Sequence, residues 1–183
     1  MSERRDPFLN LSPDPGWLPF TLPFAIGTDR FERVDTRAES IRMRFFEKPL
    51  DHSLAGWVWF GDLVAGPPGH AHGGCQAFAL DEAMGAAAWL AGRPSVAGEL
   101  NIKLFEMVPL HAAIGIEASI TLIDGKKATV VSKILDFSGK VYARGEATFV
   151  QLSKTRILEL LAKQGVSQEE VARYFERMGR ERN

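Results

Sequence analysis

One long apolar stretch, residues 75–91, stands between segments in which apolar and polar residues alternate. It is rich in Ala, Leu and Met and contains no Pro, which predicts a helix. Because it is apolar nearly all round, we expect that helix to be buried. Asp81 and Glu82 interrupt it in the middle. An ionised carboxylate is costly to bury without partners, so we expect a polar pocket to open beside this pair.

Shorter segments on both sides of the helix have the pattern of strands. Residues 41–45 alternate, and the wholly apolar segment 57–60 is expected to be covered on both faces. After Arg93-Pro94 the pattern predicts three strands joined by Asp-Gly and Ser-Gly turns: 114–122, 129–136 and 140–150. One early helix followed by hairpin-linked strands predicts an α+β fold, in which an antiparallel sheet wraps around a long central helix.

The two ends of the chain differ from this central region. Residues 1–38 contain five prolines and several large aromatic residues, which predicts an extended arm lying over the sheet or over a partner subunit. Residues 152–183 are polar with helical spacing, and Ser167 with Glu170 reads as a capping box. The sequence therefore predicts one central domain, 39–151, between an N-terminal arm and a C-terminal helical extension.

Composition narrows the class of protein. The chain has 183 residues, of which 45% are hydrophobic and 25% charged, as in an ordinary soluble domain. Its net charge of −1 gives no basic surface for nucleic acid or an anionic membrane. One cysteine excludes an internal disulfide, and the polar opening Ser2–Asp6 has no apolar leader. We expect a soluble, cytoplasmic protein.

The junction between the turn-rich segment 66–74 and the helix is the candidate for chemistry. At Gly73 and Gly74 the first N–H groups of the helix point outward, with the positive end of the helix dipole behind them. Such a site suits a carbonyl oxygen that gains negative charge. Asp81 lies two turns further on, about 10 Å from Gly74 along the axis. Because one helix cannot supply both groups to one bond, the spacing predicts a dimer.

These residues carry a resemblance to a known family. His72-Gly73-Gly74 is followed by Asp81 nine positions after the histidine, and Gly66-Pro67-Pro68-Gly69 precedes it. At these positions the chain resembles the hotdog-fold acyl-CoA thioesterases of the HGG type, the phenylacetate-pathway (PaaI-like) group. The resemblance covers roughly 39–151, where two later segments also fit the family's strands: 99–102 with 109–110, and 143–150.

The resemblance implies a fold, an assembly and an activity. The fold would be a hotdog, assembled as a homodimer or as a homotetramer that is a dimer of dimers. The activity would be hydrolysis of an acyl-CoA thioester, with coenzyme A as part of the substrate and no separate cofactor or metal. Asp81 would act as nucleophile or as general base on water, and the Gly73 N–H would be the oxyanion hole.

Other residues take supporting roles in this interpretation. His72 would orient the loop, while Gly74, His70 and Glu82 are candidates for contact with the substrate. Glu82 also fits a structural hydrogen bond. The coenzyme A phosphates would need exposed cations, for which the sequence offers four without ranking them: Lys103, Arg144, Lys126 and Lys127.

Two positions depart from the family. Many relatives have Asn six residues before the histidine and Ser or Thr sixteen residues after the aspartate; here these positions are Gly66 and Ala97. Two other functions therefore stay open: an enoyl-CoA hydratase or dehydratase that pairs His72 with Asp81, and a non-catalytic acyl-CoA-binding module. Cys75, in the first turn of the helix, is a third and minor candidate as a nucleophile.

Overall fold

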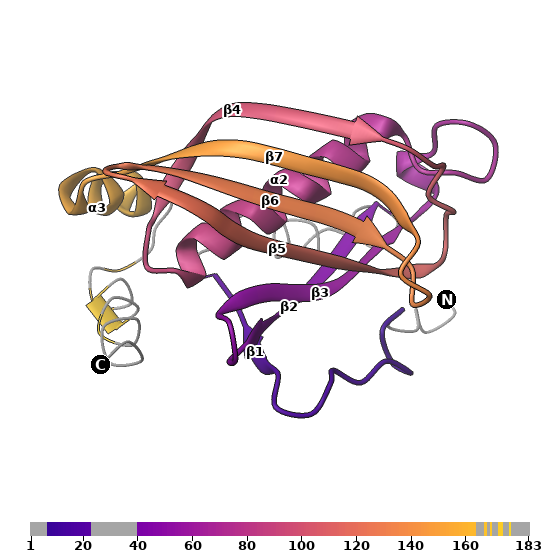
Figure 1. Cartoon of the computed structure of the whole chain (residues 1–183), viewed down its shortest axis with the longest axis horizontal. Helices are drawn as coiled ribbons and strands as arrows, with labels where there is room; N and C mark the ends of the chain where they lie inside the picture. The colour runs from indigo at the N-terminus through magenta and orange to yellow at the C-terminus, as the bar shows by residue number, and fades with distance from the viewer. Residues whose placement is uncertain are drawn as a thin grey trace.

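The computed structural model describes residues 7–22 and 40–163, together with five single positions near the C-terminus. Its elements, in chain order, are β1 (Leu18–Phe20), β2 (Ile41–Lys48), β3 (Ser53–Phe60), the short 3-10 helix η2 (Asp62–Val64), α2 (Gly73–Leu90), β4 (Ser95–Leu104), β5 (Ala113–Asp124), β6 (Lys127–Leu135), β7 (Val141–Gln151) and α3 (Lys154–Ala162). Figure 1 shows a sheet with α2 lying along one face of it.

All the described strands form one antiparallel sheet in the order β1-β2-β3-β5-β6-β7-β4. The hairpin from β5 to β6 turns at Gly125, which has the positive φ of +56° that favours glycine. Strand β5 follows β4 in the sequence, but β6 and β7 lie between them in the sheet because β4 pairs with β7. The predicted antiparallel sheet around a helix is therefore present.

Helix α2 begins at Gly73 and ends at Leu90, close to the predicted range 75–91. Its sheet-facing side is buried, with Leu80, Ala83 and Met84 inaccessible to solvent. Small residues let it lie close to the sheet: a Cβ added at Gly145 of β7 would lie 3.0 Å from Met84 Cε. The helix is thus held in a fixed position on the sheet by close packing.

Strand β4 was not among the three strands predicted after Arg93-Pro94 from the alternation of residues; only the family resemblance pointed to a strand at 99–102. It is a ten-residue edge strand that pairs with β7 on one side only. Along it only Ser95 and Ile102 are even half-buried. Residues 99–104 do alternate polar with apolar, a strand pattern that the three predicted strands did not include, and the apolar side chains of this run are mostly exposed within this chain.

The described part of the N-terminal segment, residues 7–22, packs against the sheet, and its Phe20 belongs to the main core. Leu18–Phe20 forms the edge strand β1 beside β2, and Pro19 within it fits the tolerance of edge strands for proline. Phe8 is 3% exposed and packs with Phe46 and Trp57 in a second apolar cluster. The structure thus describes a strand in the segment for which the sequence predicted an extended arm.

Helix α3 follows β7 and buries Ile157 against the main core. Beyond residue 163 the structure describes only five positions, and Glu170 of the predicted capping box is not among them. The capping box therefore stays a prediction. The same holds for the part of the predicted arm between residues 23 and 39.

Candidate active site

The loop before α2 is a tight, fully hydrogen-bonded turn. Pro67 O accepts the N–H of His70 at 2.9 Å, and Gly69 has a φ of +74°. This is the arrangement of a type II turn, which suits Pro68 at its second position and glycine at its third. The Gly66 N–H donates to His70 O and the His72 N–H donates to Val64 O, both at 2.8 Å. The Pro/Gly run therefore delivers the chain to the helix in one fixed direction.

His72 caps the helix. Its Nδ1 accepts the N–H of Gly74 at 3.0 Å, and its carbonyl oxygen accepts the N–H groups of Cys75 and Gln76. Since Nδ1 is an acceptor, the neutral ring carries its proton on Nε2. The Gly73 N–H has no hydrogen-bond partner among the described residues. The sequence offered both glycine amides as open donors, but in this geometry His72 uses the one on Gly74.

Gly73 lies against strand β4. A Cβ added at Gly73 would lie 2.7 Å from Leu104 Cδ1, closer than real Cβ contacts. Gly66 is constrained in the same way, since a Cβ there would lie 2.8 Å from the Cα of His72. The asparagine of many relatives therefore does not fit at position 66 with this loop conformation, which explains why glycine stands there.

His70 is also held by its own loop. Its Nδ1 lies 2.8 Å from Pro68 O, so this ring nitrogen donates a proton to the carbonyl. The ring is half-buried, and the backbone beside it bridges to Pro109. The structure thus places His70, His72, Gly73 and Gly74 together at the start of α2.

Asp81 and Glu82 lie on the side of α2 that its own sheet leaves open. From the second turn on, the helix residues that are not fully buried lie along one side: Ala77, Phe78, Asp81, Glu82 and Gly85. No cation forms an ion pair with either carboxylate among the described residues. Burial raises the pKa of Asp81. Burial, together with the charge of Asp81, raises the pKa of Glu82 to about 7.

These two carboxylates are not brought together with the open amide of the same chain. Gly73 and Asp81 are eight residues apart on one helix, about 12 Å along its axis. A general base must lie within hydrogen-bond reach of the water or group that it serves. Within one chain the open amide and the two carboxylates therefore lie at separate places along α2.

Two polar residues that the sequence did not single out fix the helix in place. Gln76 is 3% exposed, its Nε2 donates to Ala71 O at 3.2 Å, and its Oε1 is buried without a partner among the described residues. Ser132 is buried on β6 and donates to Leu80 O at 3.2 Å, one residue before Asp81. Both could have been found from the sequence, because each is a polar residue at an inward-facing position of an apolar helix or strand.

Several predicted details have structural explanations. Ala97 lies exposed on β4 and has no hydroxyl, while the Ser95 hydroxyl donates to Arg93 O at 2.7 Å. Burial raises the pKa of Cys75, which disfavours the reactive thiolate.

Within the described ranges, no three His, Cys, Asp or Glu residues are arranged to hold a metal ion. None of the described helices is long and apolar enough to span a bilayer.

The sequence is similar to known thioesterases. Residues 68–143 match the family model of the thioesterase superfamily. The matched range begins within the loop and includes α2, β4, β5 and β6. The human acyl-coenzyme A thioesterase THEM5 is 31% identical over 136 residues, which are 70% of this chain and 55% of the human protein. This chain thus spans about half the length of that curated thioesterase.

Solved thioesterase structures show the same fold. A crystal structure of a thioesterase superfamily protein has a TM-score of 0.56 at 27% identity, covering 60% of this chain and 54% of that one. A hypothetical thioesterase from Streptococcus pneumoniae, solved with coenzyme A, has a TM-score of 0.54 at 18% identity, covering 63% and 93%. The predicted hotdog-type thioesterase fold, an antiparallel sheet with a helix packed on it, is confirmed.

Proposed function

We propose that this protein hydrolyses an acyl-CoA thioester to a free acid and coenzyme A, at sites shared by two copies of the chain. The observation that carries the proposal is the state of the first turn of α2. There the Gly73 N–H is open, at the positive end of an 18-residue helix, while its neighbours are capped by His72. A preorganised amide of this kind stabilises the negative charge that develops on a carbonyl oxygen.

In the proposed reaction, the thioester carbonyl accepts a hydrogen bond from Gly73 N–H of one subunit. Asp81 of the other subunit removes a proton from water, whose oxygen attacks the carbonyl carbon. The C–S bond then breaks and the departing sulfur takes a proton. Asp81 attack on the carbonyl, followed by hydrolysis of the anhydride, gives the same products. Both routes use the same two groups.

The need for a second copy follows from the distance along α2 and from the exposed edge strand β4. Leu100 and Leu104 of β4 are 43% and 50% exposed, and nearby Met107 is 57% exposed. Leu104 also contacts Gly73, so this apolar edge borders the proposed oxyanion site. A partner packed here would place its own groups next to the open amide. We infer a homodimer, or a tetramer made of two such dimers.

The test is thioester hydrolysis across acyl-CoAs of different chain length and aromaticity, followed with a thiol-reactive dye. We expect Asp81→Asn to lower kcat at least about 100-fold, the range typical for loss of a general base. Asp124→Asn, an exposed carboxylate at the β5–β6 hairpin, is the matched control and should behave as wild type. Equal turnover by Asp81→Asn and wild type would refute the mechanism.

The same assay separates the two other functions. Hydration of crotonyl-CoA without release of thiol would show a hydratase. Thermal stabilisation by acyl-CoA without turnover of any substrate would show a binding module. In the proposed function, thiol release and acid formation occur in equal amounts.

A further inference from the structure

A second site lies on the face of the sheet opposite α2. A cavity of about 590 Å³ spans six strands there, from Lys48 on β2 to Lys103 on the edge strand β4. Its charged lining is mostly basic, with four cationic and three acidic side chains: Lys48, Lys103, Lys133, Arg144, Asp51, Glu117 and Glu146. Nothing in the proposed hydrolytic mechanism uses these residues.

Three of the cations form one row. Lys133 of β6 is directly opposite Arg144 of β7, and Arg144 is directly opposite Lys103 of β4. Neighbouring strands are about 4.8 Å apart, so the row places three positive side chains across about 10 Å. Like charges in directly opposite positions destabilise a sheet. An anion bound beside the three cations would offset this repulsion, so we expect such a row at an anion-binding site.

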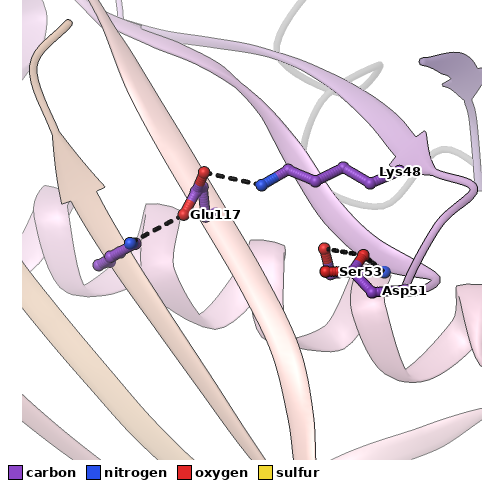
Figure 2. Close-up of polar contacts among 5 residues, drawn as sticks. Lys48, Asp51, Ser53 and Glu117 are labelled. Carbon is purple, nitrogen blue, oxygen red and sulfur yellow. Dashed lines mark hydrogen bonds and ion pairs between the residues drawn. The ribbon is translucent and has the colours of Figure 1, made fainter. Parts of the chain in front are cut away.

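The acids of the cavity leave part of this row uncompensated. Glu117 accepts from Lys48 at 2.8 Å and from Lys133 at 2.9 Å, and Figure 2 shows the carboxylate held between two cations. Burial alone would raise the pKa of Glu117, but the two lysine hydrogen bonds lower it, so the carboxylate is charged. Asp51 accepts from the backbone and hydroxyl of Ser53, also drawn in Figure 2.

Arg144 and Lys103 remain without an ion pair among the described residues, although Glu146 lies two residues from Arg144 on the same face. Both are exposed to solvent at the rim of the cavity. An arginine beside a lysine, with one guanidinium fork free, matches the geometry and charge of a phosphate group.

We propose that this cavity binds the phosphate groups of a nucleotide, with Arg144 and Lys103 as the contacting residues and Lys133 behind them. The phosphates belong either to the nucleotide part of a coenzyme A substrate or to a free nucleotide. The first source rests on the proposed function. It is compatible with the fold because Lys103 is next in sequence to Leu104, which contacts Gly73 from the other face of the same strand.

The structure also separates these cations from the other two that the sequence offered. Lys126 and Lys127 lie at the β5–β6 hairpin, and Lys127 pairs with Val150 of β7. Val150 is six residues from Arg144 along β7, about 20 Å away. Neither lysine lines the cavity. They serve as matched controls that change the same net charge at a distant place.

The direct test is titration calorimetry of the full chain with adenosine 3′,5′-bisphosphate. We expect Arg144→Gln with Lys103→Gln to weaken binding at least tenfold, while Lys126→Gln with Lys127→Gln binds as wild type. Binding to wild type should also weaken as salt is added, because screening acts on charge pairs at a surface. Equal affinity in wild type and the Arg144/Lys103 variant would overturn the proposal.

Folding is controlled by the unliganded melting temperature. Removing two like charges from opposite strand positions should leave the melting temperature of the Arg144/Lys103 variant equal to or above that of wild type. An altered oligomer mass in this variant, with nucleotide binding unchanged, would assign the row to assembly and overturn the phosphate site.

A second measurement identifies the source of the phosphate. We compare kcat/KM for an acyl-CoA with that for the same acyl group on pantetheine, which lacks the nucleotide. If the substrate supplies the phosphates, the ratio of kcat/KM for acyl-CoA to that for acyl-pantetheine should fall at least tenfold in the Arg144/Lys103 variant. If a free nucleotide supplies them, the variant should lose bisphosphate binding but keep this ratio. A protein that binds the bisphosphate but hydrolyses no thioester would refute the proposed function and leave the phosphate site standing.

Discussion

The carboxyl group of Glu82, with a pKa raised to about 7, stands next to a second acid on a largely buried helix. Its shift has two causes, burial first and the charge of Asp81 second. Asp81 is therefore the member of the pair that ionises first. At pH 7 Glu82 is therefore protonated in about half of the molecules, whereas an exposed glutamate would be almost fully ionised, and this partial protonation reduces the repulsion between the two acids.

This shift predicts a pH dependence of stability. The folded chain binds a proton at Glu82 more tightly than the unfolded chain does, whose pKa is near 4.5. The free energy of unfolding should therefore fall as pH rises from about 4.5 to 7, and stay lower above pH 7. Glu82→Gln should raise the melting temperature at pH 8 and change it much less at pH 4.5.

The control is Asp124→Asn at the exposed β5–β6 hairpin, away from the proposed dimer contact, which removes the same charge. Thermal unfolding followed by circular dichroism at both pH values measures the effect. An equal shift at pH 4.5 and pH 8 in Glu82→Gln would contradict the assigned cause.

Gly73 is the second residue with a specific expectation. A methyl group at this position would meet Leu104 Cδ1, at 2.7 Å from the added carbon. Because the contact is with the end of a flexible side chain, we expect Gly73→Ala to fold but to displace Leu104 or the amide. Its kcat/KM should drop at least tenfold, and Leu104→Ala in the same chain should restore part of it. No recovery in the double variant would show that the glycine is needed for another reason.

At this scale the sequence predicted the turn and the helix that follows it, but not the hydrogen bonds that join them. The Pro-Pro-Gly turn could be predicted because its requirements are local to four residues. Asp81 stood out because a carboxylate in an apolar helix is costly. The use of the Gly74 amide by His72 could not be predicted, because it depends on a side-chain rotamer that the loop geometry selects.

Among the elements, α2 has a glycine whose replacement should help. A Cβ added at Gly85 would lie 3.7 Å from Phe149 Cε1, an ordinary contact. Alanine is a better helix former than glycine, so Gly85→Ala should stabilise the fold by about 0.5–1 kcal/mol. Gly145→Ala on β7 is the counterpart, since its Cβ would meet Met84, Ile102 and Ser132 at 3.0–3.1 Å. Urea unfolding should move in opposite directions for the two variants.

The N-terminal segment has its own test. Phe8 is 3% exposed, and its ring lies 5.9 Å from that of Trp57. Truncating a buried phenylalanine costs about 3 kcal/mol or more, so we expect Phe8→Ala to destabilise by that amount and to change tryptophan fluorescence. The neighbouring Leu9 is 69% exposed, and Leu9→Ala should have little effect. If Phe8→Ala and Leu9→Ala unfold at the same urea concentration, the packing of this segment contributes nothing to stability.

Strands with one buried face were predicted from their alternation, and the two edge strands were not. Strands β2, β5, β6 and β7 alternate because one face of each meets the core. Strand β4 is exposed along most of its length, and β1 is three residues long and includes a proline. Strand β1 is too short to show a period, whereas residues 99–104 of β4 alternate polar with apolar although β4 has little burial within this chain.

For the whole molecule, the proposed dimer makes activity depend on assembly. We expect Leu100→Glu on β4 to produce a folded monomer, because it places a charge in the proposed apolar contact, and to abolish hydrolysis. Leu122→Glu is the control, at a position 60% exposed near the β5–β6 hairpin. In Leu100→Glu, the mass from analytical ultracentrifugation and the rate of thiol release should both fall. In Leu122→Glu, neither should change. A monomeric variant with full activity would show that one chain holds a complete site.

The two edges of the sheet are unequal, and this limits how copies can associate. At the β1 edge the strand is short and carries Pro19, which lacks an N–H to offer a neighbour. The β4 edge is ten residues long and open. Only the β4 edge can therefore pair with a strand of another copy. When the β4 strands of two copies pair with each other, neither chain keeps an open edge. Extended fibres are avoided because each copy has a single place to add the next.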